Sequence, residues 1–75
     1  MFHHIQFNES VKVDLEVSSK QPLERLCIGK GARFRAQLRP HVIDTPNGPV
    51  EAADLFFADG TAVRGVPFER FRFVD

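Results

Sequence analysis

An alternating segment, a turn and an apolar run follow one another in residues 33–57, which read RFRAQLRPHVIDTPNGPVEAADLFF. In its first seven positions, Phe34, Ala36 and Leu38 alternate with Arg or Gln. This period of two predicts a strand with one face in the core and one in water. We expect Pro40 to end the pairing of this strand or to mark a bend.

The strongest turn signal of the chain is the run DTPNGP at residues 44–49, where Asn47-Gly48 suits the positive φ angles of a tight hairpin. Residues 50–57 follow as a second strand. One of its faces carries Ala53, Leu55 and Phe57, and the other carries Val50, Ala52 and Phe56. A strand that is apolar on both faces is either central in its sheet or covered on the second face.

The flanking segments predict further short strands. Residues 11–17 alternate strictly, and residues 58–60 predict a turn into a strand over 61–66. Pro67 to Arg70 suits a single helical or 3₁₀ turn, and residues 71–74 a closing strand. Residues 20–27 have two alternative predictions. The one we prefer is a helical turn begun by Pro22, and the other is a loop that leads into a strand at 26–28. We therefore expect five or six strands in an antiparallel barrel or small sandwich.

Residues 55–74, LFFADGTAVRGVPFERFRFV, resemble the end of SH3-like barrels of the Tudor and KOW type. Those families show an apolar strand, an acidic-Gly hairpin, a strand, a one-turn 3₁₀ element and a closing strand. The resemblance implies an SH3-like barrel with one short helical or 3₁₀ turn over residues 1–75, and it implies no particular function. The chain lacks the Tyr and Trp with which Tudor cages and peptide-binding SH3 domains hold their ligands.

Seventy-five residues make a single domain with a small core. Cys27 is the only cysteine, so no disulfide forms within the chain, and a lone thiol fits a reducing cytosol. The first residues lack the charged start and apolar run of a signal peptide, and no apolar run approaches the roughly 18 residues of a membrane span. We expect a soluble cytoplasmic protein with no membrane partner.

Ten basic and ten acidic residues cancel, but the charge is unevenly spread. Residues 29–42 contain Lys30, Arg33, Arg35 and Arg39 and no acid. This row is a candidate nucleic-acid surface, because such cations contact phosphates without reading sequence. The last strands could extend it with Arg64, Arg70 and Arg72. The alternative is that the row pairs across strands with Asp14, Glu16, Glu51 or Asp54.

Catalytic and metal-binding patterns are weak. The soft ligands are His3, His4, His41 and Cys27, without metal-site spacing, and we expect no metal and no cofactor. Cys27 lies between Leu26 and Ile28 and is predicted to be a core residue rather than a nucleophile. Gly29-Lys30-Gly31 predicts a turn, because the remainder of a phosphate loop is missing. We expect no catalytic residues and no small-molecule substrate.

Eight Phe without Trp or Tyr indicate core packing more than recognition. Phe2, Ile5, Val50 and Phe56 are apolar residues beyond those that the predicted core uses. Either other parts of the domain cover them, or they form a protein interface. We therefore expect a non-catalytic interaction module that binds a protein partner or itself, the second case giving a homodimer. The alternatives are a nucleic-acid-binding accessory domain that uses the basic row and, less favoured, a small enzyme or metal protein.

Overall fold

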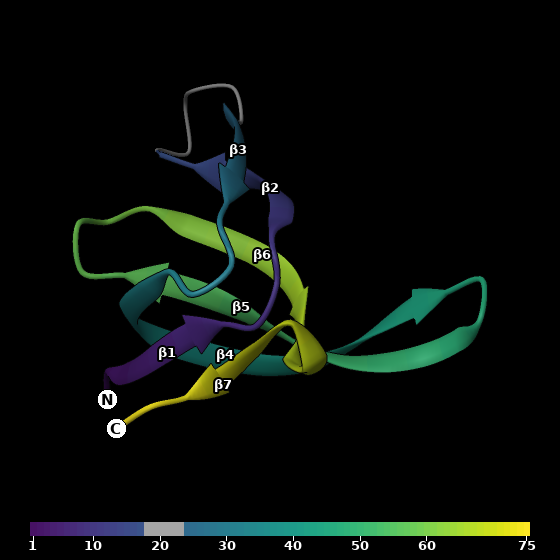
Figure 1. The fold of residues 1–75 in the computed structure, drawn as a ribbon. Helices are drawn as coiled ribbons and strands as arrows, with labels where there is room; N and C mark the ends of the chain where they lie inside the picture. The colour runs from purple at the N-terminus through teal and green to yellow at the C-terminus, as the bar shows by residue number, and fades with distance from the viewer. Residues whose placement is uncertain (18–23) are drawn as a thin grey trace.

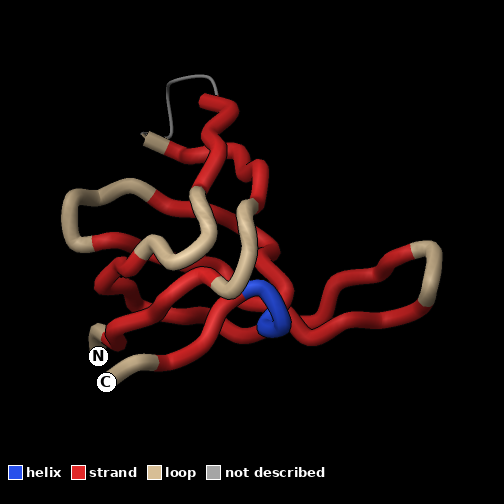
Figure 2. Tube along the Cα trace, viewed as in Figure 1, coloured by secondary structure: helices blue, strands red, loops and turns tan. Residues whose placement is uncertain are grey.

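The computed structural model describes residues 1–17 and 24–75. Within these ranges the chain forms seven strands and one 3₁₀ turn (Figures 1 and 2). The elements are β1 (His3–Phe7), β2 (Val11–Glu16), β3 (Glu24–Ile28), β4 (Arg33–Thr45), β5 (Gly48–Phe57), β6 (Ala62–Pro67), η1 (Phe68–Arg70) and β7 (Phe71–Phe73). In the described part of the chain, no helix is long and apolar enough to cross a membrane.

The strands form one antiparallel sheet in the order β3-β2-β6-β5-β4-β1-β7, curled into a half-barrel. β4, β5 and β6 are consecutive neighbours, while β1 lies between β4 and β7 and joins the two ends of the chain. The predicted count of five or six strands is too low, because β1 was not counted. Its residues alternate weakly, and it is ordered by pairing with distant partners on β4 and β7.

Several predicted elements are confirmed. The alternating segment 11–17 forms β2 up to Glu16, the segment 33–39 lies in β4, and Phe34, Ala36 and Leu38 turn inward. The two-faced segment is the central strand β5, which pairs with β4 and β6. The 3₁₀ turn and the closing strand also occur where the sequence predicts them.

Pro40 does not end the pairing of β4, so the first of the two alternatives expected for it is wrong. It lies opposite Ala53, and β4 continues to Thr45. Proline is tolerated here because β1 pairs with β4 only from Arg33 to Ala36, which leaves the other edge of β4 open at Pro40.

The turn between β4 and β5 is as tight as the sequence predicts, but its geometry differs. Thr45 pairs with Gly48 around Pro46 and Asn47, and Gly48 has a φ of 110° while Asn47 has a negative one. The Oγ1 of Thr45 donates to the carbonyl of Gly48 at 2.6 Å and accepts from the N–H of Asn47 at 3.2 Å. Glycine alone therefore supplies the left-handed residue of this turn.

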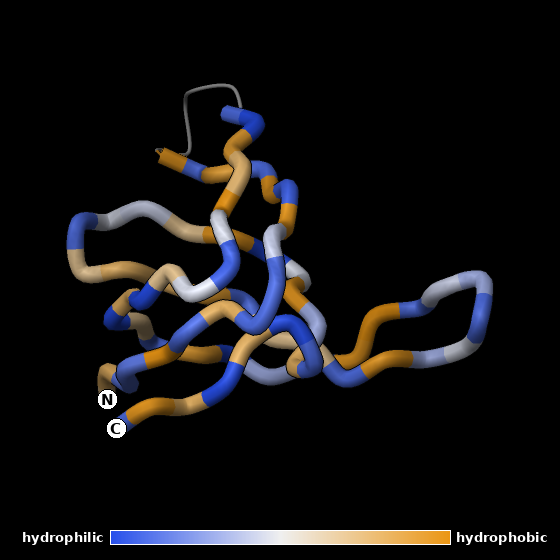
Figure 3. The backbone as a smooth tube through the Cα atoms, in the orientation of Figure 1, coloured by the Kyte–Doolittle hydropathy of each residue, from blue (hydrophilic) through white to orange (hydrophobic). Residues whose placement is uncertain are grey.

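The core lies on the concave side of the sheet. Ile5, Phe7, Leu55 and Val63 are its largest fully buried side chains. Phenylalanine rings connect them, with centroids 5.9 Å apart for Phe7–Phe34, 5.3 Å for Phe34–Phe57 and 6.1 Å for Phe7–Phe71. The alternation of apolar and polar positions along the chain is visible in Figure 3. Packing of this kind supports the interpretation of most Phe residues as core.

β3 departs from the sequence-based expectation in two ways. Glu24 to Leu26 are strand rather than helical turn, while residues 20–23 of that prediction lie outside the described residues. Cys27 is exposed rather than buried. Both differences arise because β3 is an edge strand whose one partner within residues 1–17 and 24–75 is β2, so that Ile28 alone among its residues is buried in the core.

Candidate functional site

An apolar groove of about 480 Å³ opens between the β2–β3 hairpin, the start of β4 and the turn from β5 to β6. Its apolar lining residues are Leu15, Leu26, Ile28, Phe34, Phe57, Ala58 and Val63. Ile28 and Val63 belong to the buried core, so the groove leads directly onto the core. The groove exists because the curled sheet joins β3 to β2 alone, without pairing to β4.

Leu26 is the most exposed apolar wall of this groove, at 42% of its surface. The side chains of neighbouring strand residues alternate between faces, so Leu26 points toward the groove side and Cys27 away from it. The sequence did not single out Leu26, because its charged and polar neighbours in β3 hide a local apolar pattern. Only the approach of β3 to β4 and β5 makes it part of a groove.

Two arginines of β4, Arg33 and Arg35, also line the groove, together with Asp59 and Thr61. The Asp59 carboxylate accepts from the Thr61 N–H at 3.0 Å and the Thr61 hydroxyl at 2.6 Å, and these hydrogen bonds lower the pKa of Asp59. The negative charge of Asp59 is thus held by the turn, as expected of an Asp-Gly hairpin. Arg33 and Arg35 flank Phe34 on β4, so their side chains leave the strand on the face opposite to that ring and place positive charge beside the groove, not among its apolar walls.

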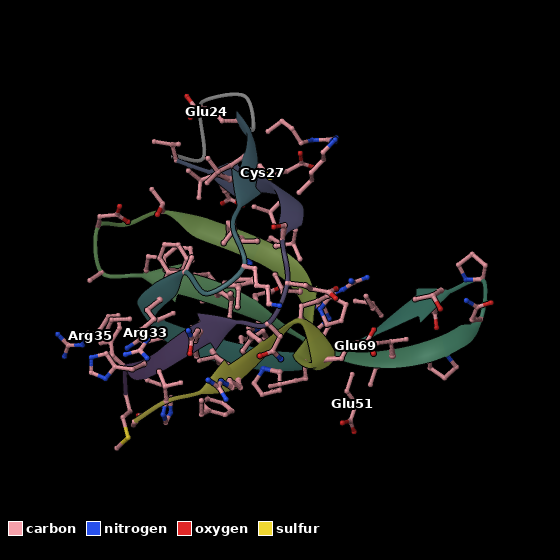
Figure 4. All side chains as sticks on the ribbon, in the orientation of Figure 1. Glu24, Cys27, Arg33, Arg35, Glu51 and Glu69 are labelled. Atoms are coloured by element: carbon pink, nitrogen blue, oxygen red, sulfur yellow. The ribbon has the colours of Figure 1, made fainter. Side chains whose placement is uncertain are left out.

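Of the predicted basic row, Arg33, Arg35 and Arg39 lie on the outward face of β4 and Lys30 precedes that strand, and all four are exposed. Among the described residues, no acidic side chain lies within 4 Å of any of them. The alternative of cross-strand pairing does not hold for this row, because its proposed acids bind elsewhere or stay apart. Figure 4 shows Arg33 and Arg35 near the start of β4, at the end of the molecule where the chain termini lie.

The possible extensions of the row behave differently from one another. Arg72 lies two strands from Arg33 with Gln6 between them, and its Nη2 donates to the Oε1 of Gln6 at 3.0 Å. Arg70 pairs with Glu9. Arg64 pairs with Glu16 and Asp54, which neutralise it. The basic surface therefore gains Arg72 only.

A polar cluster centred on Asp54 connects four strands. Its Oδ1 accepts from the N–H of Gly65 at 2.8 Å and lies 2.9 Å from the Nε2 of His41, while its Oδ2 accepts from Arg64 at 3.4 Å. Burial opposes ionisation of Asp54, but Gly65, His41 and Arg64 outweigh it and lower the pKa of the carboxyl. Glu16 holds the other side of the Arg64 guanidinium and raises its pKa.

This cluster has a structural role at an irregularity of the sheet. Between Ala53 and Leu55 the register with β6 shifts, so that Arg64 and Gly65 together oppose Asp54. Two residues against one form a β-bulge, whose displaced N–H needs a partner. The Asp54 carboxylate supplies that partner.

The proposed apolar interface is not a single surface. Ile5 is completely buried and belongs to the core, so its predicted place in a protein interface is wrong. Phe2 and Phe56 are half-buried under the guanidinium groups of Arg35 and Arg64, each 5.0 Å from the ring centroid. Val50 lies apart from both, on the hairpin beyond the body of the sheet.

That hairpin forms an arm, residues 42–51, which projects away from the rest of the molecule (Figure 1). β6 pairs with β5 from Ala52 onward and β1 pairs with β4 only up to Ala36. In the described chain, the arm therefore has no strand beside either edge. Val42 in this arm is 61% exposed.

His3 and His4 are neighbours on β1 and so lie on opposite faces of that strand, while His41 lies on β4. His3 Nδ1 is 3.4 Å from the carboxylate of Asp75, His4 is exposed, and His41 contacts Asp54. Across residues 1–17 and 24–75, no three His, Cys, Asp or Glu side chains gather as they would around a metal ion.

Neither a protein-family model, nor a curated protein, nor a solved structure matches this chain.

Proposed function

We propose that this chain is a non-catalytic interaction module whose groove binds an extended segment of a protein. The observation that carries the proposal is the open apolar groove between β2–β3 and β4, which leads onto the core. Apolar pockets that open to solvent are the usual sites of recognition in small domains.

The chemistry of the groove supports a particular kind of segment. Its walls are aliphatic and aromatic, while Arg33 and Arg35 offer bidentate donors to carboxylates. The outer edge of β3 beside it has no strand partner among the described residues, so it can pair with an incoming strand. A segment that combines apolar side chains with acids suits these features.

The same proposal includes an SH3-like barrel in a reducing compartment. Support for the fold comes from the consecutive strands β4, β5 and β6, the 3₁₀ turn after β6, and the pairing of β7 with β1. Support for a cytoplasmic setting comes from Cys27, a lone and exposed thiol.

A titration watched by amide NMR tests the binding function. The probe is a short extended peptide that alternates valine with glutamate, and the matched control peptide carries glutamine instead. We expect shifts at Ile28, Phe34 and residues 58–61 with the acidic peptide and weaker ones with the control. No shift at these amides contradicts the proposal.

A pair of variants shows whether the groove carries the binding. Leu26→Asp places a charge on the groove wall and should abolish the shifts. Val17→Asp changes a side chain of similar exposure, 38%, that does not line the groove, and should leave them unchanged. Equal effects of the two substitutions would count against the groove.

A nucleic-acid-binding domain is the second candidate, favoured by the basic row that lacks acidic partners in the described part of the chain. Its test is the fluorescence anisotropy of a labelled single-stranded RNA and a short DNA duplex at two salt concentrations. We expect affinity to fall with salt by a log–log slope of about 0.9 per phosphate contacted on duplex DNA. Arg39→Ala should weaken binding, whereas Arg25→Ala, which removes a cation already paired with Asp14, should not. Absence of binding at low salt rejects this candidate.

A further inference from the structure

The arm carries a combination of side chains that matches the groove. Val42 lies directly opposite Glu51 in the β4–β5 register, and Asp44 is two residues beyond Val42 on the same strand. Directly paired residues, and residues two apart on one strand, share a face. One face of the arm thus presents an exposed valine between two carboxylates.

These carboxylates are not engaged elsewhere in the described structure. Neither Asp44 nor Glu51 has an ion pair or a side-chain hydrogen bond with a residue in ranges 1–17 and 24–75. Both residues are exposed. The arm is therefore an acidic and apolar strand pair with both of its edges open.

We propose that the groove receives the arm of a second copy of this chain, with Val42 against the apolar walls and Asp44 and Glu51 beside Arg33 and Arg35. This inference rests on the proposed function, because it names the occupant of the same groove. Charge complementarity carries it: Arg33 and Arg35 have no acidic partner among the described residues and line the groove, and Asp44 and Glu51, equally without a cationic partner there, flank the exposed valine of the arm.

The contact is head to tail. Figure 4 shows Arg33 and Arg35 at one end of the molecule and Glu51 at the root of the arm, well away from them. The groove and the arm share no residue, so a copy that inserts its arm into a neighbour keeps its own groove open. Such heterologous contacts continue into rings or chains instead of stopping at a symmetric pair.

Sedimentation velocity of the whole chain tests the contact. A small interface of this kind is weak, so we expect association between about 10 μM and 1 mM. The weight-average mass should rise continuously past twice the 8.5 kDa of one chain, and added salt should reduce it.

Two variants, each altered at one side of the contact, locate it. Val42→Asp changes the arm, and Arg33→Glu with Arg35→Glu changes the groove; all three positions are exposed, so the fold should persist. Each variant alone should remain a monomer. When mixed, the intact arm of the groove variant should enter the intact groove of the arm variant, and the complex should stop at two chains.

The matched control is Lys30→Glu with Arg39→Glu, which makes the same change of charge at residues that do not line the groove. It should retain the self-association of the original chain. Equal loss in the control would show unspecific attraction between charged surfaces and would overturn the inference.

The remaining outcomes separate this inference from the proposed function. A chain that stays monomeric at about 1 mM while its groove binds the acidic peptide overturns self-recognition and keeps the interaction module, with another protein as partner. A chain that neither associates nor binds the peptide overturns both. Association that stops at a symmetric dimer, or that the mixed variants fail to restore, also overturns the head-to-tail contact.

Discussion

The Oδ1 atom of Asp54 lies 2.8 Å from the backbone nitrogen of Gly65, and this hydrogen bond joins the buried carboxylate of β5 to the bulge of β6. A charged side chain thereby satisfies a backbone donor that the regular ladder leaves without a partner. The bulge turns Arg64 toward Glu16 and Asp54 on the outer face. A bulge increases the local twist of its strand, so this contact stabilises a twisted segment of β6.

Replacing Asp54 by Asn should lower the free energy of unfolding by about 1–3 kcal/mol at pH 7, because the charge-assisted bonds to His41 and Arg64 are weakened. Far-UV circular dichroism during urea unfolding measures this, since the chain has no Trp or Tyr. Asp14→Asn, at an exposed pair with Arg25, should cost under about 1 kcal/mol.

The contribution of Asp54 also predicts a dependence on pH. Its folded-state pKa lies below the ordinary value of 3.8, so its stabilising effect is present above that value and is lost as pH falls through the folded pKa. The difference in stability between the native chain and Asp54→Asn should therefore shrink as the solution is acidified below about pH 4. A difference that stays constant down to pH 2 would contradict this assignment.

Gly65 should resist substitution, because its φ of 66° lies in the left-handed region. Gly65→Ala is expected to cost about 1–2 kcal/mol through backbone strain alone, since the new Cβ would meet Ile43 only at an ordinary 3.8 Å. Gly29→Ala is the control, with no positive φ and no atom within 4 Å of the added Cβ. Urea unfolding of both variants should show a near-neutral effect for Gly29.

Two leucines should differ in their contribution to stability. Leu55 is fully buried, so Leu55→Ala should lower the free energy of unfolding by about 2–5 kcal/mol. Leu26→Ala removes an exposed groove wall and should cost less than about 1 kcal/mol while weakening peptide binding. A large loss of stability at Leu26 would indicate that the groove is closed in solution.

Cys27 should react readily in the folded chain. Its thiol is exposed on β3, so Ellman's reagent should modify it at similar rates in buffer and in denaturant. Cys27→Ser should leave the free energy of unfolding within about 0.5 kcal/mol of the original value. Strong protection of the thiol in buffer would show that β3 packs against something else.

Local patterns predicted much of the fold. The period of two placed β2 and the first half of β4, and the two-faced segment placed β5 at the centre of the sheet. The turn after Phe57, the 3₁₀ turn and the closing strand were also predicted. These elements are recognisable because each is specified by neighbours along the chain.

The errors share one physical origin. β1 forms a strand because it pairs with β4 and β7. Pro40 fits within β4 because the edge of β4 beside it is open in the described chain. Cys27 is exposed because β3 lies at the edge of the sheet. The basic row of the candidate site was predicted, because its period lies within one strand. The groove was not, because Leu15, Leu26, Phe34 and Phe57 come from four separate strands.

By itself, then, the sequence determined that the segments of β2, the first half of β4, β5, β6 and β7 are strands, and where the cations gather, since side-chain alternation and turn chemistry act over a few residues. Only the tertiary structure decided which strands lie at the edges, how far the arm projects and that the sheet stays open beside β3. These properties depend on contacts between residues distant in sequence. The pairing and burial energies of such contacts are summed over several segments, so no single segment determines them.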